Sequence, residues 1–121
     1  MKYTTATALL SLLGTAAAWS NMEECGKRSP TVVNAIGKFC QNPSIVVPST
    51  QADNGGSGYS ENTKVKITGT CSPPQWVPTY WCMQQFYDVC ATSEDPTTGS
   101  GGAHYGNNGC QYFQIANSVA S

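Results

Sequence analysis

Residues 63–70 read TKVKITGT and carry the clearest strand signal in the chain. Val65 and Ile67 point to one side of an extended backbone, whereas Lys64 and Lys66 point to the other. Alternation with a period of two is typical of a half-buried β-strand, one face of which packs against a core while the other meets water. The segment therefore predicts a strand with one face in the core.

Three further segments predict strands around this one. The β-branched run 45–47 is expected to form a hairpin with 63–70, joined by a long loop whose tip is the Gly-rich segment 54–58. Residues 110–116 alternate in the same way and predict the last strand. Residues 19–25 are interpreted as a first strand.

Two segments predict helices. Ser29 can cap the first helix and Pro30 suits its first turn, and the pair 42–43 ends it. The second helix is expected over residues 78–91, and residues 92–109 are expected to form a flexible polar loop. One face of the second helix gathers four residues of core type: Cys82, Phe86, Val89 and Cys90.

The predicted elements follow one another in the order βαββαβ. This order predicts an α+β fold, a small ferredoxin-like sandwich in which two helices cover one face of an antiparallel sheet. In that topology the first strand lies between the third and the fourth, and the two helices run roughly parallel.

The first 18 residues predict a secretion signal peptide. Lys2 precedes an apolar centre with four leucines, and the small residues 16–18 suit a cleavage site. The apolar run is shorter than the ~20 residues that cross a bilayer. The chain therefore divides into a signal peptide, 1–18, and a single disulfide-rich domain, 19–121, and we expect a secreted, extracellular protein without a membrane span.

Six cysteines follow the signal, and an even number in a short secreted chain predicts three disulfides. Metal binding is the alternative, but no C-x-x-C pair or Cys/His cluster is present, so we expect no metal. Cys82 and Cys90 cannot pair, because eight residues of helix separate them by ~12 Å. The βαββαβ topology favours one of fifteen possible pairings: Cys25–Cys110, Cys40–Cys90 and Cys71–Cys82.

The charge of the chain is low. Only 11% of its residues are charged and the formal net charge is −1. This composition excludes a disordered tail kept soluble by charge. It also argues against nucleic acid as a partner, because such binding needs a basic patch.

No residue pattern points firmly to catalysis. His104 is the single histidine and is interpreted as an exposed loop residue rather than a general acid or base. The acidic pairs 23–24 and 94–95 are interpreted as solvated surface rather than as the two carboxylates of a glycosidase. The Gly-rich loops lack the context of a phosphate-binding motif. We therefore expect no enzyme activity and no cofactor.

Aromatic residues offer better candidates for binding. Five of them crowd into residues 76–87, and aromatic rings stack on sugars and anchor protein interfaces. Trp81 and Phe86 are expected in the core. For Trp76 a core position and presentation to a partner by the stiff Pro-Pro-Gln loop are equally expected. The candidate binding residues are Trp76, Tyr80, Tyr105, Asn107 and Asn108.

The layout of the cysteines and two short runs carry a resemblance. The run PPQWVP at 73–78 leads to Cys82 and Cys90, and YGNNGCQ follows at 105–111. The chain resembles the small cysteine-rich secreted proteins of filamentous fungi, many of them candidate effectors of plant-associated species. The βαββαβ order is also similar to that of the killer-toxin-like effectors. The resemblance implies secretion and action on a host or a rival cell, including the host apoplast, and it implies no catalytic residue.

These observations lead to several hypotheses about function. The first is a non-catalytic effector of the virulence type that binds a host protein or another host component. The second is a lectin-like protein that binds a cell-wall glycan through its aromatic residues. The third is an antifungal toxin of the killer type, and an enzyme that uses His104 comes last.

Overall fold

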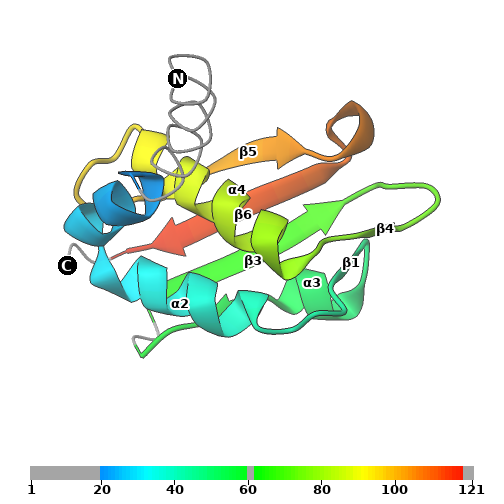
Figure 1. The fold of residues 1–121 in the computed structure, drawn as a ribbon, viewed down its shortest axis with the longest axis horizontal. Helices are drawn as coiled ribbons and strands as arrows, with labels where there is room; N and C mark the ends of the chain where they lie inside the picture. The colour runs from blue at the N-terminus through cyan, green and yellow to red at the C-terminus, as the bar shows by residue number, and fades with distance from the viewer. Residues whose placement is uncertain (1–19, 60–61, 119–121) are drawn as a thin grey trace, which may run out of the picture.

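Two layers build the molecule: an antiparallel sheet, and helices that lie against one of its faces (Figure 1). The computed structural model describes residues 20–59 and 62–118. Residues 20–28 are helical, and the further helices are α2 (Pro30–Cys40), α3 (Thr50–Asn54), α4 (Thr79–Thr92) and the 3-10 turn η1 (Asn107–Gly109). The strands are β1 (Val46–Val47), β2 (Gly56–Ser57), β3 (Thr63–Gly69), β4 (Gln75–Trp76), β5 (Gly101–Tyr105) and β6 (Gln111–Asn117).

The main sheet has the order β2-β3-β6-β5, and every neighbouring pair is antiparallel. The central pair β3–β6 places Val65 opposite Ile115 and Ile67 opposite Phe113, and all four side chains are buried. The alternation at 63–70 and at 110–116 is therefore confirmed as a pair of strands with one face in the core. The other face of this sheet carries polar and small side chains.

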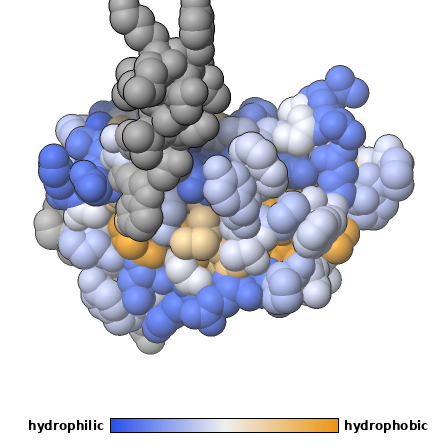
Figure 2. All heavy atoms as spheres, in the orientation of Figure 1, coloured by the Kyte–Doolittle hydropathy of each residue, from blue (hydrophilic) through white to orange (hydrophobic). Residues whose placement is uncertain are grey.

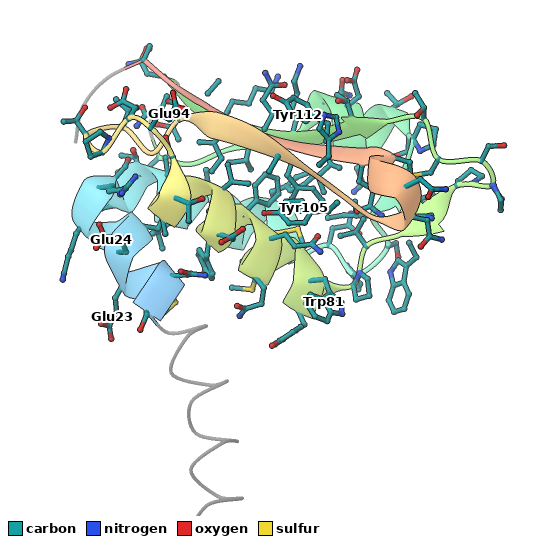
Figure 3. All side chains as sticks on the ribbon, turned by 90° about the horizontal axis from the view of Figure 1, so that it is seen from above. Glu23, Glu24, Trp81, Glu94, Tyr105 and Tyr112 are labelled. Atoms are coloured by element: carbon teal, nitrogen blue, oxygen red, sulfur yellow. A yellow bond between two sulfur atoms is a disulfide. The ribbon has the colours of Figure 1, made fainter. Side chains whose placement is uncertain are left out.

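The helices α2 and α4 cover the apolar face of the sheet, as the edge-on view shows (Figure 3). Ser29 caps α2 as expected, because its hydroxyl oxygen accepts a hydrogen bond from the Val32 amide. Phe86 of α4 packs against Phe113 at 4.7 Å and against Phe39 of α2 at 5.9 Å between ring centroids. The predicted α+β class, with an antiparallel sheet and its main helices on one face, is confirmed. The order of the elements differs from βαββαβ, because the described chain has no strand before α2 and has further short elements between α2 and α4.

Three disulfides cross this core, but with a pairing that differs from the expected one. The structure joins Cys25 to Cys90, Cys40 to Cys82, and Cys71 to Cys110. The expected pairs Cys25–Cys110, Cys40–Cys90 and Cys71–Cys82 are therefore wrong. The separation of Cys82 from Cys90 along one helix is confirmed.

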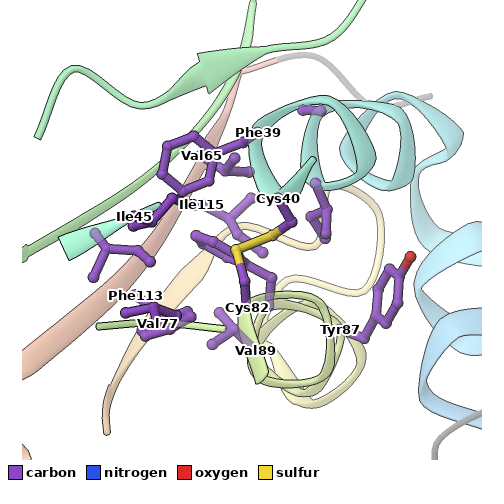
Figure 4. Close-up of a cluster of buried hydrophobic side chains, with 14 of the residues drawn as sticks. Phe39, Cys40, Ile45, Val65, Val77, Cys82, Tyr87, Val89, Phe113 and Ile115 are labelled. Carbon is purple, nitrogen blue, oxygen red and sulfur yellow. A yellow bond between two sulfur atoms is a disulfide. The ribbon is translucent and has the colours of Figure 1, made fainter. Parts of the chain in front are cut away.

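The direction of the elements explains the difference. The end of α2 meets the beginning of α4, so the two helices run antiparallel and Cys40 reaches Cys82 (Figure 4). Cys25 lies in the helical segment before α2 and therefore meets the other end of α4. Cys71 and Cys110 flank the paired strands β3 and β6, which bring them together.

Three local expectations also fail. Residues 20–28 form a helix where a first strand was expected at 19–25. β1 pairs with β4 and not with 63–70, because α3 and β2 occupy the intervening chain and β2 takes the place beside β3. The segment 92–109 is more than a flexible loop, because it contains the edge strand β5.

The helix side of the molecule is largely hydrophilic, with hydrophobic side chains in small patches (Figure 2). No helix in the described ranges 20–59 and 62–118 has both the length and the apolar character needed to cross a membrane. The proposed signal peptide, 1–18, lies outside these ranges.

Candidate binding site

Aromatic side chains gather at the end of the molecule where α4 begins. The two-stranded ribbon β1–β4 lies here, together with the turn between β5 and β6 (Figure 1). The Val77 amide donates a hydrogen bond to the Ile45 carbonyl at 2.8 Å, and the Val77 side chain is buried. Since side chains alternate along an extended chain, the neighbouring Trp76 points outward and is 61% exposed.

The indole of Trp76 is held in place by the backbone. Its Nε1–H donates to the Pro43 carbonyl oxygen at 2.7 Å. This bond satisfies the polar edge of the ring and leaves the apolar faces open to solvent. Trp76 is therefore a fixed aromatic surface rather than a mobile side chain.

Trp81 and Tyr80 project from the first turn of α4. They are 52% and 59% exposed, and their rings meet edge to face at 5.1 Å. Cys82 next to them is buried in its disulfide with Cys40 and anchors this turn. The expectation that Trp81 lies in the core is wrong, whereas the same expectation for Phe86 is confirmed.

Trp76 and Trp81 line a common hollow of about 260 Å³. Two polar residues, Gln85 and Gln111, also line it. The other lining residues are Val77, Pro78 and Gly106. Rings combined with a few placed polar groups are typical of small-ligand sites.

A second hollow, of about 550 Å³, contains the predicted residues Asn107 and Asn108. It lies between the loop 70–75 and the turn 107–110, beside the Cys71–Cys110 disulfide. Gln75 joins the two segments, because its Oε1 accepts hydrogen bonds from the Asn107 amide at 3.3 Å and from Gln111 Nε2 at 3.0 Å. Gln75 lines the second hollow and Gln111 the first, so the two hollows adjoin.

Two other candidates lie beside the first hollow rather than in its wall. Tyr80 contacts Trp81. Tyr105 faces α4, where its hydroxyl donates to Asp88 Oδ2 at 2.8 Å and its ring packs on Phe113. Burial, and then the Asp88 carboxylate, raise the pKa of Tyr105 well above its ordinary value, so the hydroxyl stays protonated. A role for Tyr80 and Tyr105 in binding stays a prediction.

Of the seven residues that line the first hollow, sequence reasoning proposed only Trp76 for binding and placed Trp81 in the core. The five that it missed are Val77, Pro78, Gln85, Gly106 and Gln111. A helical signal linked two of the lining residues. Trp81 and Gln85 are four residues apart on a helix and so share a face, which lies beside the core face of Cys82 and Phe86. No local signal pointed to Gln111, because only the pairing of β5 with β6 brings it here.

The candidates for acid–base chemistry lie apart from one another. Glu23, Glu24 and Glu94 lie at the opposite end of the molecule from Trp81 (Figure 3). His104 is exposed on β5, where its Nδ1 donates to the Gly109 carbonyl oxygen at 3.1 Å. In the described part of the chain, no group of three or more His, Cys, Asp or Glu side chains could hold a metal ion.

Comparisons with known proteins add no assignment. No protein-family model, no curated protein and no solved structure matches this chain. The resemblance to fungal effectors and to the killer-toxin-like group therefore stays a prediction.

Proposed function

We propose that this protein is a secreted, non-catalytic binding protein that holds a neutral cell-wall glycan in the hollow between Trp76 and Trp81. One observation carries the proposal: two tryptophans, each more than half exposed, line one hollow that two glutamines also line. Three disulfides are typical of an extracellular protein and support this place of action.

The physical reason lies in the aromatic faces. Exposing a large ring to water is unfavourable unless a partner covers it, so exposed tryptophans mark interaction sites. The apolar face of a sugar ring can cover them. The hydrogen bond from Trp76 to Pro43 fixes one ring before binding, which reduces the entropy lost on association.

The chemistry of the lining favours a neutral ligand. None of the seven lining residues carries a charge. The side-chain amide of Gln85 can donate to and accept from sugar hydroxyls, whereas the Gln111 amide is already bonded to Gln75. A charged ligand would find no partner of opposite sign in this hollow.

A host protein is the second candidate ligand, in keeping with an effector of the virulence type that acts in the host apoplast. The specific observation is that Tyr80 adds a third exposed ring beside Trp81. Exposed tryptophan and tyrosine are the residues that most often dominate the energy of protein interfaces.

A pull-down distinguishes the two candidates. The oxidised, secreted protein is incubated with insoluble chitin, β-glucan, cellulose and plant cell wall, and the retained fraction is measured. We expect retention on at least one polymer, with about a tenfold loss of affinity in Trp76→Ala and in Trp81→Ala. The matched control is Tyr59→Ala, because Tyr59 is also exposed, at 65%, but does not line the hollow.

The outcome decides between the ligands. Retention that is equal in Trp76→Ala and in the wild type would place glycan binding elsewhere. Retention on none of the polymers would reject a glycan ligand and leave the host protein as the candidate. Circular dichroism of each variant checks that the fold is retained.

A further inference from the structure

The outer face of the main sheet is largely open, because α2 and α4 lie against its other face and α3 lies beside the β3 edge (Figures 1 and 3). Strand pairing defines which side chains share this outer face. Lys66 lies opposite Gln114, Thr68 opposite Tyr112, and Tyr112 opposite His104. The full set on β2, β3, β6 and β5 is Ser57, Lys64, Lys66, Thr68, Tyr112, Gln114, Ala116, Gly102 and His104.

Tyr112 lies across this face rather than standing away from it. A Cβ atom built on Gly102 would lie 2.3 Å from the Tyr112 hydroxyl oxygen and 2.5 Å from Cζ. The ring therefore covers the backbone of β5 at a position where only glycine leaves room for it. The Tyr112 ring therefore lies along the outer face of the sheet.

His104 extends this surface. Its ring lies 4.7 Å from the Tyr112 ring, with 37° between the planes. The hydrogen bond from His104 Nδ1 to the Gly109 carbonyl holds the imidazole in place. Two neighbouring rings that lie close to the sheet can stack against successive rings of a chain-like ligand.

The charges on this face have one sign. Lys64 and Lys66 point outward two residues apart on β3, which is roughly 7 Å along a strand. No carboxylate is among the outer-face side chains of the described strands. Asp53 lies at the edge of β3, where it lines a separate hollow with Thr68. The face therefore complements a ligand that carries negative charge.

We infer that the outer face of the sheet binds an acidic polysaccharide, with uronate carboxylates on Lys64 and Lys66 and sugar rings on Tyr112 and His104. This site is separate from the hollow of Trp76 and Trp81 and does not depend on it. A nucleic acid would offer similar chemistry, but the three disulfides suit an extracellular setting. This setting favours the glycan.

The experiment measures binding of the oxidised protein to soluble polygalacturonate by isothermal titration calorimetry at low ionic strength, with dextran as the neutral comparison. The double variant Lys64→Gln/Lys66→Gln should bind about tenfold more weakly, because two charge-assisted contacts are lost. The matched control is Lys27→Gln/Lys38→Gln, which removes the same charge from two exposed lysines of the helical segments. This control should keep the wild-type affinity.

A third variant tests the aromatic part of the site without changing charge. Gly102→Ala displaces the free end of the Tyr112 ring and should also weaken binding of polygalacturonate. Trp76→Ala should leave this binding unchanged, so the result does not depend on the fate of the neutral-glycan proposal.

Three outcomes would overturn the inference. The first is that polygalacturonate does not bind. The second is an equal loss in both double lysine variants, because attraction by overall charge would then explain the binding. The third is tighter binding of a 20-nucleotide single-stranded DNA than of polygalacturonate, which would assign the face to a nucleic acid.

Discussion

The two ends of α4 lie in contrasting surroundings. Where α4 finishes, at what we term the closed end, Arg28 and Asn117 donate hydrogen bonds to backbone carbonyl groups, and the Cys25–Cys90 disulfide ties the helix to the segment before α2. Where α4 begins, at the aromatic end, Trp76, Tyr80 and Trp81 are exposed.

Arg28 shows how the closed end is built. Its guanidinium donates to the carbonyl oxygens of Ser93 at 2.7 Å and Cys90 at 3.2 Å. The last carbonyl groups of a helix have no partner within the helix, and a cation there also suits the helix dipole. Arg28 Nε also forms a salt bridge with Glu24 Oε1 at 3.3 Å.

The difference indicates that the groups that stabilise the fold and the proposed binding surface lie at opposite ends of one helix. In the described part of the chain, no buried side-chain nitrogen or oxygen lacks a hydrogen-bond partner, and the closed end supplies several of these bonds. The aromatic end leaves its large rings in water. Substitutions should therefore reduce stability at one end and binding at the other.

Removal of the Cys25–Cys90 disulfide should have the largest effect. Cys25→Ala/Cys90→Ala opens a bridge between residues 65 apart in the sequence and should lower the free energy of unfolding by about 3–4 kcal/mol. Urea denaturation measures the change. Cys71→Ala/Cys110→Ala is the comparison and should cost less, because the β3–β6 ladder already holds its ends. A larger loss of unfolding free energy in Cys71→Ala/Cys110→Ala would contradict the view that the closed end contributes most to stability.

Asn117→Ala should come next. Asn117 is buried, its Nδ2 donates to the Thr98 carbonyl at 3.0 Å, and its Oδ1 accepts from Thr63 Oγ1 at 3.0 Å. Loss of the amide leaves these groups without this partner in the interior, so we expect a loss of about 2 kcal/mol. Gln114→Ala, on the open face of the same strand, is the control and should change stability by less than about 0.5 kcal/mol. An equal fall in melting temperature for the two variants would contradict a stabilising role of the buried Asn117 amide.

Adjacent residues test the aromatic end. Val77→Ala should lower stability by about 1–2 kcal/mol, because Val77 is buried. Trp76→Ala removes a far larger but exposed side chain and one hydrogen bond, and should cost less than about 1 kcal/mol. Urea denaturation of the two variants side by side gives the order. A greater loss for Trp76→Ala would make this tryptophan structural rather than a free binding surface.

The smallest effect concerns pH. Hydrogen bonds from the Thr98 and Thr97 side chains and from the Thr97 amide lower the pKa of Asp95 from 3.8 to about 2. A lowered pKa means that the ionised group stabilises the fold above pH 4 and that this contribution disappears as the pH falls toward 2. Asp95→Asn should therefore lower the melting temperature slightly at pH 6 and not at pH 2. If the difference in melting temperature between Asp95→Asn and the wild type is the same at pH 6 and at pH 2, the ionised Asp95 carboxylate does not stabilise the fold.

Local patterns along the chain were sufficient to predict most of the regular elements. α2, α4, β3 and β6 follow from capping residues and from helical or two-residue periodicity, which act over neighbouring residues. The sequence left open whether Trp76 is buried or presented by a stiff loop, and the structure exposes it. The α+β class followed from these elements, because each has one apolar face that must be covered.

Contacts between distant segments decided the rest. The pairing of six cysteines depends on which helix ends meet, and the antiparallel course of α2 and α4 has no local signature. The Gly-rich strand β5 forms because β6 supplies its hydrogen bonds, not because its own residues favour a strand. The same holds for both sites, since the walls of the hollow and the open face of the sheet come from segments that only the tertiary structure brings together.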